Sequence, residues 1–361
     1  MIAEKKINLK LKNQSVPIHI GNKLLQSFDV SPYVKNKNVV IVTNSTVGKL
    51  YLKQTKRLFN NHKVDCLLIP DGEKYKNRDT LDKIHSYLLK QKYDRSLTIV
   101  ALGGGVIGDM VAFAADTFMR GVSLIHIPTT LLAQVDSSIG GKCGINHARG
   151  KNLIGSFKHP SLILMDTSTL QTLPKREFKA GMAEVIKYGL IKSKSFFDFL
   201  YKNHNKVLNQ EDSFLLRVIS TCASIKSKVV REDELESGVR ALLNFGHTFG
   251  HAIEASKNYK GILHGEAVSI GMNIASAISA DQGYLAYKEY CRVEDILMEM
   301  QMPTMIPKRI NVSNIMKHID HDKKKLAGVN RFILINKIGS AFIHKNLNNK
   351  YLSDLSKNFI S

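Results

Sequence analysis

The chain has 361 residues, of which 43% are hydrophobic and 23% charged, as in ordinary globular proteins. No apolar run approaches the roughly 20 residues of a membrane span, and the first residues lack the apolar segment of a signal peptide, so we expect a cytoplasmic protein. The formal net charge is +21. The lysines of the chain are scattered and do not alternate with aromatic residues, which favours a solvated surface over nucleic-acid binding. The positive charge also suits an anionic small substrate.

Short apolar runs alternate with helical patterns up to about residue 170. Residues 7–11 and 16–20 alternate like a half-exposed hairpin. Later runs are apolar on successive residues, which is typical of parallel strands covered on both faces. These runs are 39–42, 64–69, 97–102, 122–127 and 162–165. The pattern predicts an α/β N-terminal nucleotide-binding (Rossmann-like) domain over residues 1–174.

A glycine-rich motif at 103–109, Gly-Gly-Gly-Val-Ile-Gly-Asp, separates an apolar run from an alanine-rich helical segment. A strand, a glycine turn and a helix place backbone N–H groups where a phosphate can sit. Glycine there tolerates positive φ and has no Cβ to block a ligand. The spacing is not G-x-G-x-x-G, so a tight turn without a ligand is the alternative.

A long loop-like region follows at 128–142 and 150–155. Such loops often carry function, and Lys142, Lys151 and Asn152 are suitable donors for an anion; the alternative is a solvated loop. Cys143 either fills this loop or is a thiol of lowered pKa. None of the four cysteines forms a C-x-x-C pair, so no disulfide framework is expected.

From Pro174 to about residue 320 helical periodicity dominates, and 331–335 with 341–344 suit a small sheet. We therefore expect a mostly α-helical second domain over 175–361. Within it, five polar residues are spaced by 4, 3, 4 and 3, which on one helix makes a single stripe: Arg240, Asn244, His247, His251 and Glu254. Its histidines suit a lined cavity better than a solvated face. Gly246 and Gly250, each costing about 1 kcal/mol of helix propensity, predict close packing there.

Metal binding is a second interpretation of this region. His247 and His251, four apart, are able to share one ion, although no glutamate lies between them. His264 and Glu184 are further candidates, and Glu184 shares a helix face with Lys187. A carboxylate and two imidazoles suit Zn²⁺ with one open position. Spacing alone does not choose which two histidines bind.

Together these motifs resemble the 3-dehydroquinate synthases over essentially the whole chain. The resemblance is carried by residues 71–76, 103–109, 128–130, 135–138, 140–142, 150–152, 180–187, 244–251, 263–266 and 322–324. Small departures are Cys143, Ala148 and Ser168, where threonine, proline and aspartate are more usual.

The resemblance implies a phosphate-eliminating cyclase. It would convert 3-deoxy-D-arabino-heptulosonate 7-phosphate to 3-dehydroquinate, using NAD catalytically and a divalent metal, Zn²⁺ or Co²⁺. A ring hydroxyl is oxidised, phosphate is eliminated, the ketone is reduced again, and an aldol step closes the ring. The cofactor carries the hydride chemistry, and the protein supplies orientation and charge. The expected assembly is a homodimer.

The same resemblance implies roles for individual residues. The implied metal ligands are Glu184, His247 and His264. The implied NAD-binding positions are Asp71, Gly72, Glu73, Lys74, Tyr75, Lys76, Gly105, Val106, Ile107, Gly108, Asp109, Thr129, Thr130, Lys142, Lys151, Thr169, Leu170, Gln171 and Thr172. The implied substrate and catalytic positions are Arg120, Asp136, Lys142, Asn152, Lys187, Lys226, Arg240, Asn244, His251 and Lys324.

Within that last set, Arg240 and Lys226 would hold a carboxylate, and Arg120 would reach the phosphate bound by a neighbouring subunit. Asp136 and Lys187 would orient the hydroxyl that is oxidised, and His251 would serve the substrate or proton transfer. Lys142, Asn152, Asn244 and Lys324 would contact phosphate and hydroxyls. The alternatives are another sugar phosphate cyclase, a metal-dependent polyol dehydrogenase of related fold, and a non-enzymatic basic binding protein.

Overall fold

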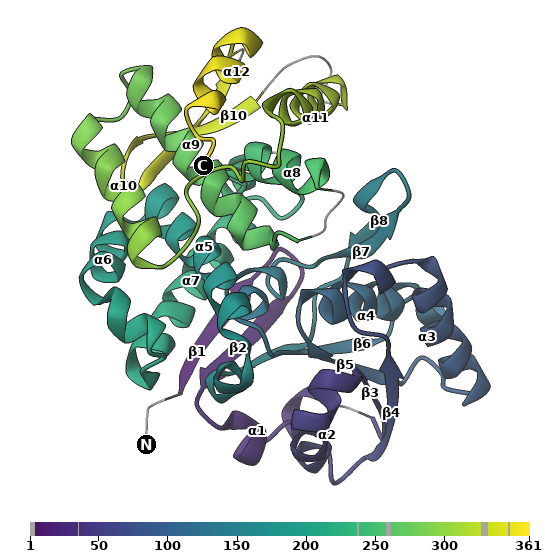
Figure 1. Cartoon of the computed structure of the whole chain (residues 1–361). Helices are drawn as coiled ribbons and strands as arrows, with labels where there is room; N and C mark the ends of the chain where they lie inside the picture. The colour runs from purple at the N-terminus through teal and green to yellow at the C-terminus, as the bar shows by residue number, and fades with distance from the viewer. Residues whose placement is uncertain (1–3, 35, 237, 258–260, 326–330, 346) are drawn as a thin grey trace. The chain divides into compact units, whose positions relative to one another are not determined.

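The computed structural model describes residues 4–34, 36–236, 238–257, 261–325, 331–345 and 347–361, and the side chains of 321–325 lie outside the described set. Two compact units make up the chain (Figure 1). Unit 1 comprises Met1–Leu173 and Asp212–Glu234, and unit 2 comprises Pro174–Glu211 and Leu235–Ser361. Among the described helices, none is both long and apolar enough to cross a membrane.

Unit 1 is built on a seven-stranded sheet in the order β1-β2-β9-β6-β5-β3-β4. Its strands are β1 (Lys5–Lys10), β2 (Ser15–Gly21), β3 (Asn38–Asn44), β4 (Lys63–Ile69), β5 (Thr98–Gly103), β6 (Ser123–Pro128) and β9 (Leu162–Asp166). The first two strands pair antiparallel, and all other neighbours are parallel. The predicted hairpin and the five predicted parallel strands are therefore confirmed.

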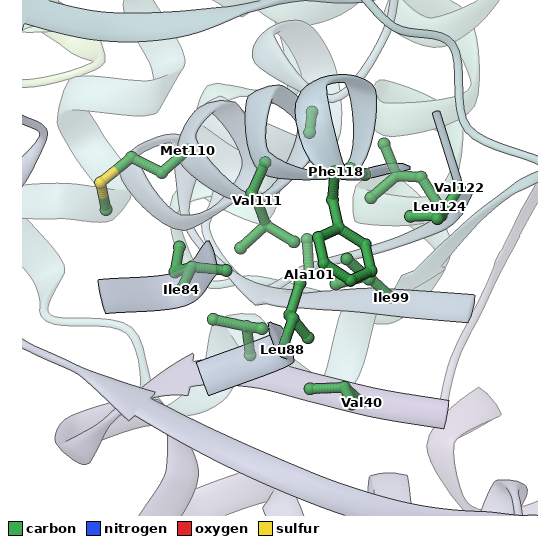
Figure 2. Packing of buried hydrophobic residues seen from close by; sticks show 14 of the residues in the cluster. Val40, Ile84, Leu88, Ile99, Ala101, Met110, Val111, Phe118, Val122 and Leu124 are labelled. Atoms are coloured by element: carbon green, nitrogen blue, oxygen red, sulfur yellow. The ribbon is translucent and has the colours of Figure 1, made fainter. Parts of the chain in front are cut away.

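Alternate residues of each central strand pack against helices on opposite faces of the sheet, which explains the unbroken apolar runs. The helices are α1 (Leu24–Ser27), α2 (Ser45–Leu58), α3 (Arg78–Lys90) and α4 (Gly105–Thr117). Val40, Ile99 and Leu124 join the cluster formed with α3 and α4, where Phe118 points toward the strands (Figure 2). Ile41 belongs to the other cluster, with α1 and α2.

The direction of strand addition reverses between β3 and β5. The chain passes from β3 outward to β4, returns to β5 and then continues to β6 on the other side. In open parallel sheets, ligands bind beyond the carboxyl ends of the strands at such a reversal. The glycine motif lies there: β5 ends at Gly103, Gly104 is the N-cap, and α4 begins at Gly105.

The expectation of positive φ in this motif is wrong, because none of its glycines is among the positive-φ residues and Gly104 has φ −77°. Close packing explains them instead. A Cβ on Gly104 would lie 3.0 Å from Thr130 Cγ2, and one on Gly105 would lie 3.0 Å from Ser137 Oγ. The motif therefore brings the start of α4 against the segment that follows β6.

The region expected to be a long loop is structured. Ala133–Ser137 forms a π-helical turn, and β7 (Lys142–His147) pairs antiparallel with β8 (Gly150–Phe157). Glycine made this hairpin hard to recognise. A Cβ on Gly144 or Gly155 would overlap the backbone of the opposite strand, so glycine is required at both positions. Glycine is uncommon inside strands, and the segment therefore resembled a loop. Short 3-10 turns complete unit 1 at Ser31–Tyr33, Glu73–Tyr75, Phe118–Arg120 and Thr167–Thr172.

Unit 2 is mostly helical, as predicted, with one small sheet. Its helices are α5 (Lys175–Lys192), α6 (Lys194–Leu208), the 3-10 helix η6 (Val239–Asn244), α8 (His247–Ser256), α9 (His264–Asp281), α10 (Tyr287–Glu299), α11 (Val312–Lys325) and α12 (Asn349–Lys357). β10 (Arg331–Lys337) and β11 (Ser340–Lys345) form the expected antiparallel pair.

The division into units departs from the expected domains in one segment. Helix α7 (Asp212–Glu232) belongs to unit 1, where it packs against β1 and the π-helical turn, although it lies within the expected 175–361 domain. The apolar face of α7 predicts that the helix is buried, but it does not indicate which of the two units the helix packs against. The boundary at residues 174/175 stays a prediction.

The polar stripe does not lie on one helix, so that expectation is wrong. Arg240 and Asn244 belong to η6, and α8 begins only at His247. Gly246 separates them with φ 80°, and a Cβ there would lie 2.6 Å from Met272 Cγ. The expected close packing is present, because a Cβ on Gly250 would lie 3.1 Å from Val268 Cα of α9.

Candidate functional site

Three potential metal ligands converge in unit 2. Glu184 lies on α5, His247 is the first residue of α8, and His264 is the first residue of α9. Glu184 Oε1 lies 3.6 Å from His247 Nε2 and 3.9 Å from His264 Nε2. One ligand atom from each residue lies within 4.8 Å of the others, so one cation would reach all three.

The two histidines present the same ring nitrogen to Glu184. His247 Nδ1 donates a hydrogen bond to the Phe245 carbonyl at 3.2 Å, and His264 Nδ1 donates to Glu254 Oε2 at 3.0 Å. Each Nδ1 therefore carries a proton, and each Nε2 is the nitrogen that faces Glu184. Burial, together with the nearby Lys187, lowers the pKa of His247 well below its usual value, which keeps this imidazole neutral.

The Glu184 carboxylate is buried, with 1% exposed, and neither of its oxygens accepts a hydrogen bond from any residue that the structure describes. Its Oε2 forms an ion pair with Lys187, which is also 1% exposed. A buried carboxylate requires a cation or strong donors. Its Oε1 faces two imidazole nitrogens, and one carboxylate with two imidazoles is a donor set that fits a borderline divalent ion such as Zn²⁺ or Co²⁺.

An ion pair holds the segment that carries His264. Arg176 donates to both oxygens of Glu266, at 2.6 and 2.8 Å, and to the Gly261 carbonyl at 3.0 Å. Glu266 also accepts from the Leu263 N–H at 2.9 Å. This contact fixes the start of α9 and with it the position of His264. Glutamate at the third helical position is a known signal for such a cap, but neither this cap nor its partner Arg176 was predicted.

The other implied residues of unit 2 differ in exposure, and His251 lies beside this cluster. The exposed His251 ring lies 5.2 Å from that of His247 and 5.9 Å from that of His264. Arg240 is buried, with 3% exposed. Asn244 is exposed and donates to Glu236 Oε1 at 3.1 Å. The side chain of Lys324 lies outside the described residues.

In unit 1, polar residues lie at the carboxyl ends of β3, β4 and β6. Asp71 follows β4 and accepts hydrogen bonds from Asn44 Nδ2 at 2.8 Å and from Thr46 Oγ1 at 3.0 Å. Thr129 follows β6, and its N–H donates to the Gly103 carbonyl at 3.0 Å. These contacts bring the glycine motif and the 71–76 segment to the same edge of the sheet.

Lys76 connects two of the implied positions. Its Nζ donates to Asp109 Oδ2 and to Asn152 Oδ1, both at 2.5 Å, and the residue is 4% exposed. Burial raises the pKa of Asp109, and the ammonium of Lys76 opposes that rise. Asn152 has a left-handed backbone with φ 54°, which aims its side chain at Lys76.

Asn146 was not among the predicted site residues, although it connects the segments of this region. Its N–H donates to the Lys76 carbonyl at 2.7 Å, and its Nδ2 donates to Glu73 Oε1 at 2.7 Å. Its Oδ1 accepts from the Asn152 N–H at 2.9 Å. Glu73 and Lys76 are far from Asn146 in the chain, so no local pattern indicated the role.

The segment at 169–172 forms part of the Thr167–Thr172 turn and contacts the α2 side of unit 1. Tyr51 OH donates to the Thr169 carbonyl at 3.1 Å and contacts the Thr172 hydroxyl. Gln134 Nε2 donates to Thr169 Oγ1 at 3.1 Å. The turn is therefore fixed in position, while Gln171 remains exposed.

Asp136 and Lys226 form a second charged pair in unit 1. Lys226 Nζ donates to the Asp136 carbonyl at 2.6 Å and to its Oδ1 at 2.7 Å. Asp136 lies in the π-helical turn, a feature frequent at functional sites. Lys142 at the start of β7 is exposed, and so is Arg120, which has a left-handed φ of 62°.

Burial raises the pKa of the Cys143 thiol, and its Sγ donates to the Ser156 carbonyl at 3.3 Å. This environment favours the thiol over the thiolate. The expectation that Cys143 fills a space is therefore better supported than the alternative of a lowered pKa.

Family models match most of the chain. The 3-dehydroquinate synthase N-terminal model matches residues 66–180, and the 3-dehydroquinate synthase C-terminal model matches residues 181–325. A 3-dehydroquinate synthase of Vesicomyosocius okutanii is 46% identical over 98% of this chain and 99% of its own. One from Hydrogenovibrio crunogenus is 46% identical over 94% of this chain and 95% of its own.

Solved structures of related cyclases have the same fold. A 2-epi-5-epi-valiolone synthase from Streptomyces hygroscopicus, with NAD⁺ and Zn²⁺ bound, is 26% identical, with a TM-score of 0.89 over 97% of this chain and 98% of its own. A 2-deoxy-scyllo-inosose synthase with carbaglucose-6-phosphate, NAD⁺ and Co²⁺ is 26% identical, with a TM-score of 0.87 over 98% of this chain and 100% of its own. A glycerol dehydrogenase from Schizosaccharomyces pombe, at 15% identity and a TM-score of 0.69, shares the fold alone.

Proposed function

The chain belongs to the 3-dehydroquinate synthase family, and we propose here which residues perform the family's reaction. It is an NAD- and metal-dependent enzyme that forms 3-dehydroquinate from 3-deoxy-D-arabino-heptulosonate 7-phosphate with elimination of phosphate. The observation that carries this function is the match of both family models over residues 66–325, together with relatives that align over nearly the full chain. The polyol dehydrogenases share only the fold, so that alternative is not favoured.

We propose that Glu184, His247 and His264 are the metal ligands. The support is their convergence within 4.8 Å and the buried carboxylate, which accepts no hydrogen bond from the described part of the chain. When bound, the metal supplies Lewis acidity toward substrate hydroxyls, and NAD supplies reversible hydride exchange. Lys187, buried beside Glu184, provides a positive charge that favours the alkoxide form of a nearby hydroxyl.

NAD binding is proposed for the carboxyl edge of the unit 1 sheet. The start of α4 directs backbone N–H groups toward a pyrophosphate, with Gly105 to Asp109 as the first helical residues. We assign five further parts of the chain to the same edge: residues 71–76, 129–130 and 169–172, Lys142 and Lys151. The support for this assignment is the reversal of strand order and the contact network of Asp71, Lys76 and Asp109.

Substrate contacts are proposed from charge and hydrogen-bonding capacity. A guanidinium binds a carboxylate through two parallel hydrogen bonds, so Arg240 is the proposed carboxylate anchor. Lys226 already donates twice to Asp136, and this pair is proposed to orient the hydroxyl that is oxidised. Lys142, Asn152, Asn244 and Lys324 are proposed to hold phosphate and hydroxyls, and His251 to move a proton.

We further propose a homodimer in which Arg120 serves the site of the neighbouring subunit. The support is the exposure of Arg120 beside Met119, an apolar side chain with 41% exposed. Sedimentation of the purified protein tests the assembly. The expected cytoplasmic location stays a prediction from the sequence.

The function is tested by phosphate release from 3-deoxy-D-arabino-heptulosonate 7-phosphate with metal-loaded protein. Release is expected with NAD⁺ and is expected to stop when NAD⁺ is omitted or the metal is chelated. Release that is equally fast without NAD⁺ would contradict the function.

A further inference from the structure

Glu254 lies on α8 seven residues after His247 and faces the start of α9. It is 3% exposed, and its Oε2 accepts the hydrogen bond of His264 Nδ1 at 3.0 Å. The other nitrogen of the same ring, Nε2, lies 3.9 Å from Glu184 Oε1. A carboxylate therefore lies on each side of the His264 imidazole, and only that of Glu254 is hydrogen-bonded to it.

We propose that Glu254 is a positioning residue, which fixes the tautomer and ring orientation of His264 so that Nε2 is available to a divalent cation. This inference rests on the proposed metal role of Glu184, His247 and His264. A neutral imidazole carries its proton on either nitrogen, and only the Nδ1–H form leaves Nε2 free. A carboxylate at Nδ1 selects that form and makes Nε2 a stronger donor.

His247 provides an internal comparison. Its Nδ1 donates to the Phe245 carbonyl at 3.2 Å, so a backbone acceptor fixes the same tautomer. His264 opens α9, and its Nδ1 is instead held by a side chain from α8. The two histidines therefore have the same tautomer but different Nδ1 acceptors. Only the acceptor of His264 is a side chain, so only that one is removable by substitution.

A second cation is the competing interpretation of the same residues. His251, Glu254 and His264 each offer a ligand atom within 4.8 Å of the others. The 3.0 Å contact has hydrogen-bond geometry, and a protonated Nδ1 cannot bind a metal. The positioning role therefore accounts for Glu254 without a second ion, and the two interpretations predict different metal stoichiometry.

The test compares Glu254→Gln and Glu254→Ala with the unaltered full chain. Glu299→Gln is a matched control, because Glu299 Oε2 contacts His204 Nε2 at 3.1 Å and lies outside the cluster. Thermal unfolding selects the variants that remain folded, and the isosteric glutamine variant preserves side-chain volume. Zn²⁺ and Co²⁺ affinities are then measured by titration, and nitrogen NMR of the metal-free protein reports the His264 tautomer, with His264→Ala identifying the signal.

We expect one ion per chain, an affinity about 10- to 100-fold weaker in Glu254→Ala, a smaller loss in Glu254→Gln and no loss in Glu299→Gln. The NMR spectrum of Glu254→Ala should show loss of the Nδ1–H preference. Unchanged affinity and tautomer in both Glu254 variants, with binding lost in His264→Ala, would overturn the inference alone. Two ions per chain, one of them lost in the Glu254 variants, would also overturn it. Full metal binding by His264→Ala would overturn the metal assignment and this inference with it.

Discussion

Lys226 donates hydrogen bonds to both the backbone carbonyl and the side-chain carboxylate of Asp136, at 2.6 and 2.7 Å. Both residues belong to unit 1, with Lys226 on α7 and Asp136 in the π-helical turn. Lys226 is 5% exposed, whereas the Asp136 side chain is partly exposed. A pair held in this way acts as one functional group.

The first prediction is therefore non-additivity of Lys226 and Asp136. Lys226→Met and Asp136→Asn should each lower kcat/KM strongly, and the double variant should lose little more than either single one, because each substitution already breaks the pair. Steady-state kinetics of the unaltered protein, the two single variants and the double variant measure this double-mutant cycle. If the free-energy losses calculated from kcat/KM add in the double variant, the two residues have independent roles.

The second prediction concerns Arg240. Arg240→Ala should weaken substrate binding by about one to two orders of magnitude, since a hydrogen bond to a charged group contributes about 1.5–3 kcal/mol. Arg240→Lys should restore only part of the loss, because lysine lacks the paired donors of a guanidinium. The measurement is calorimetric titration of substrate analogues with and without the carboxylate. Equal weakening of both analogues would transfer the carboxylate role to another residue.

The third prediction separates the histidines as ligands. His264→Ala should lose the bound metal and the activity while keeping its unfolding temperature close to that of the unaltered protein. His251→Ala, the matched control, should retain the metal, because His251 is outside the group formed by Glu184, His247 and His264. Metal content after dialysis checks both variants. Metal retained in His264→Ala but lost in His251→Ala would reverse the assignment.

The fourth prediction is a dependence of stability on His126. Burial beneath the glycine motif lowers the pKa of His126 to about 4. An unfolded histidine titrates near about 6.5, so protonation favours the unfolded chain. The contribution of His126 is complete above about pH 6.5 and declines as the pH falls toward 4, by about 3 kcal/mol in total.

Urea unfolding across this pH range measures the effect. His126→Gln should flatten the decline, whereas His147→Gln, which changes an exposed histidine of the same unit, should leave it unchanged. A decline equally steep in His126→Gln would show that other groups cause it.

Much of unit 1 was predictable from the sequence, because strands buried on both faces are apolar at consecutive positions. The run at 97–102 and strand β5 differ by one residue at each end. The hairpin of β7 and β8 was missed, since Gly144 and Gly155 are needed where the strands approach most closely. Glycine is typical both of loops and of closely packed strands, so its presence here predicted a loop.

The candidate site was also only partly predictable from the sequence. Residue types and spacing indicated Glu184, His247, His251 and His264, but the choice among the histidines required the resemblance to a family. The single helix expected through Arg240 and His247 was wrong, because a φ of 80° at Gly246 is not visible in a 3.6-residue pattern. Glu254 belonged to that pattern, but its contact with His264 depends on how α8 packs on α9.

The most direct test is the number of products formed per NAD⁺. Metal-loaded protein is freed of nucleotide, supplied with NAD⁺ at far below the substrate concentration, and followed for both phosphate and NADH absorbance. The reaction is redox-neutral, so phosphate should exceed the NAD⁺ supplied many times over, with no net NADH. Formation of NADH in proportion to substrate, with turnover stopping when NAD⁺ is exhausted, would identify a simple dehydrogenase and contradict the proposed function.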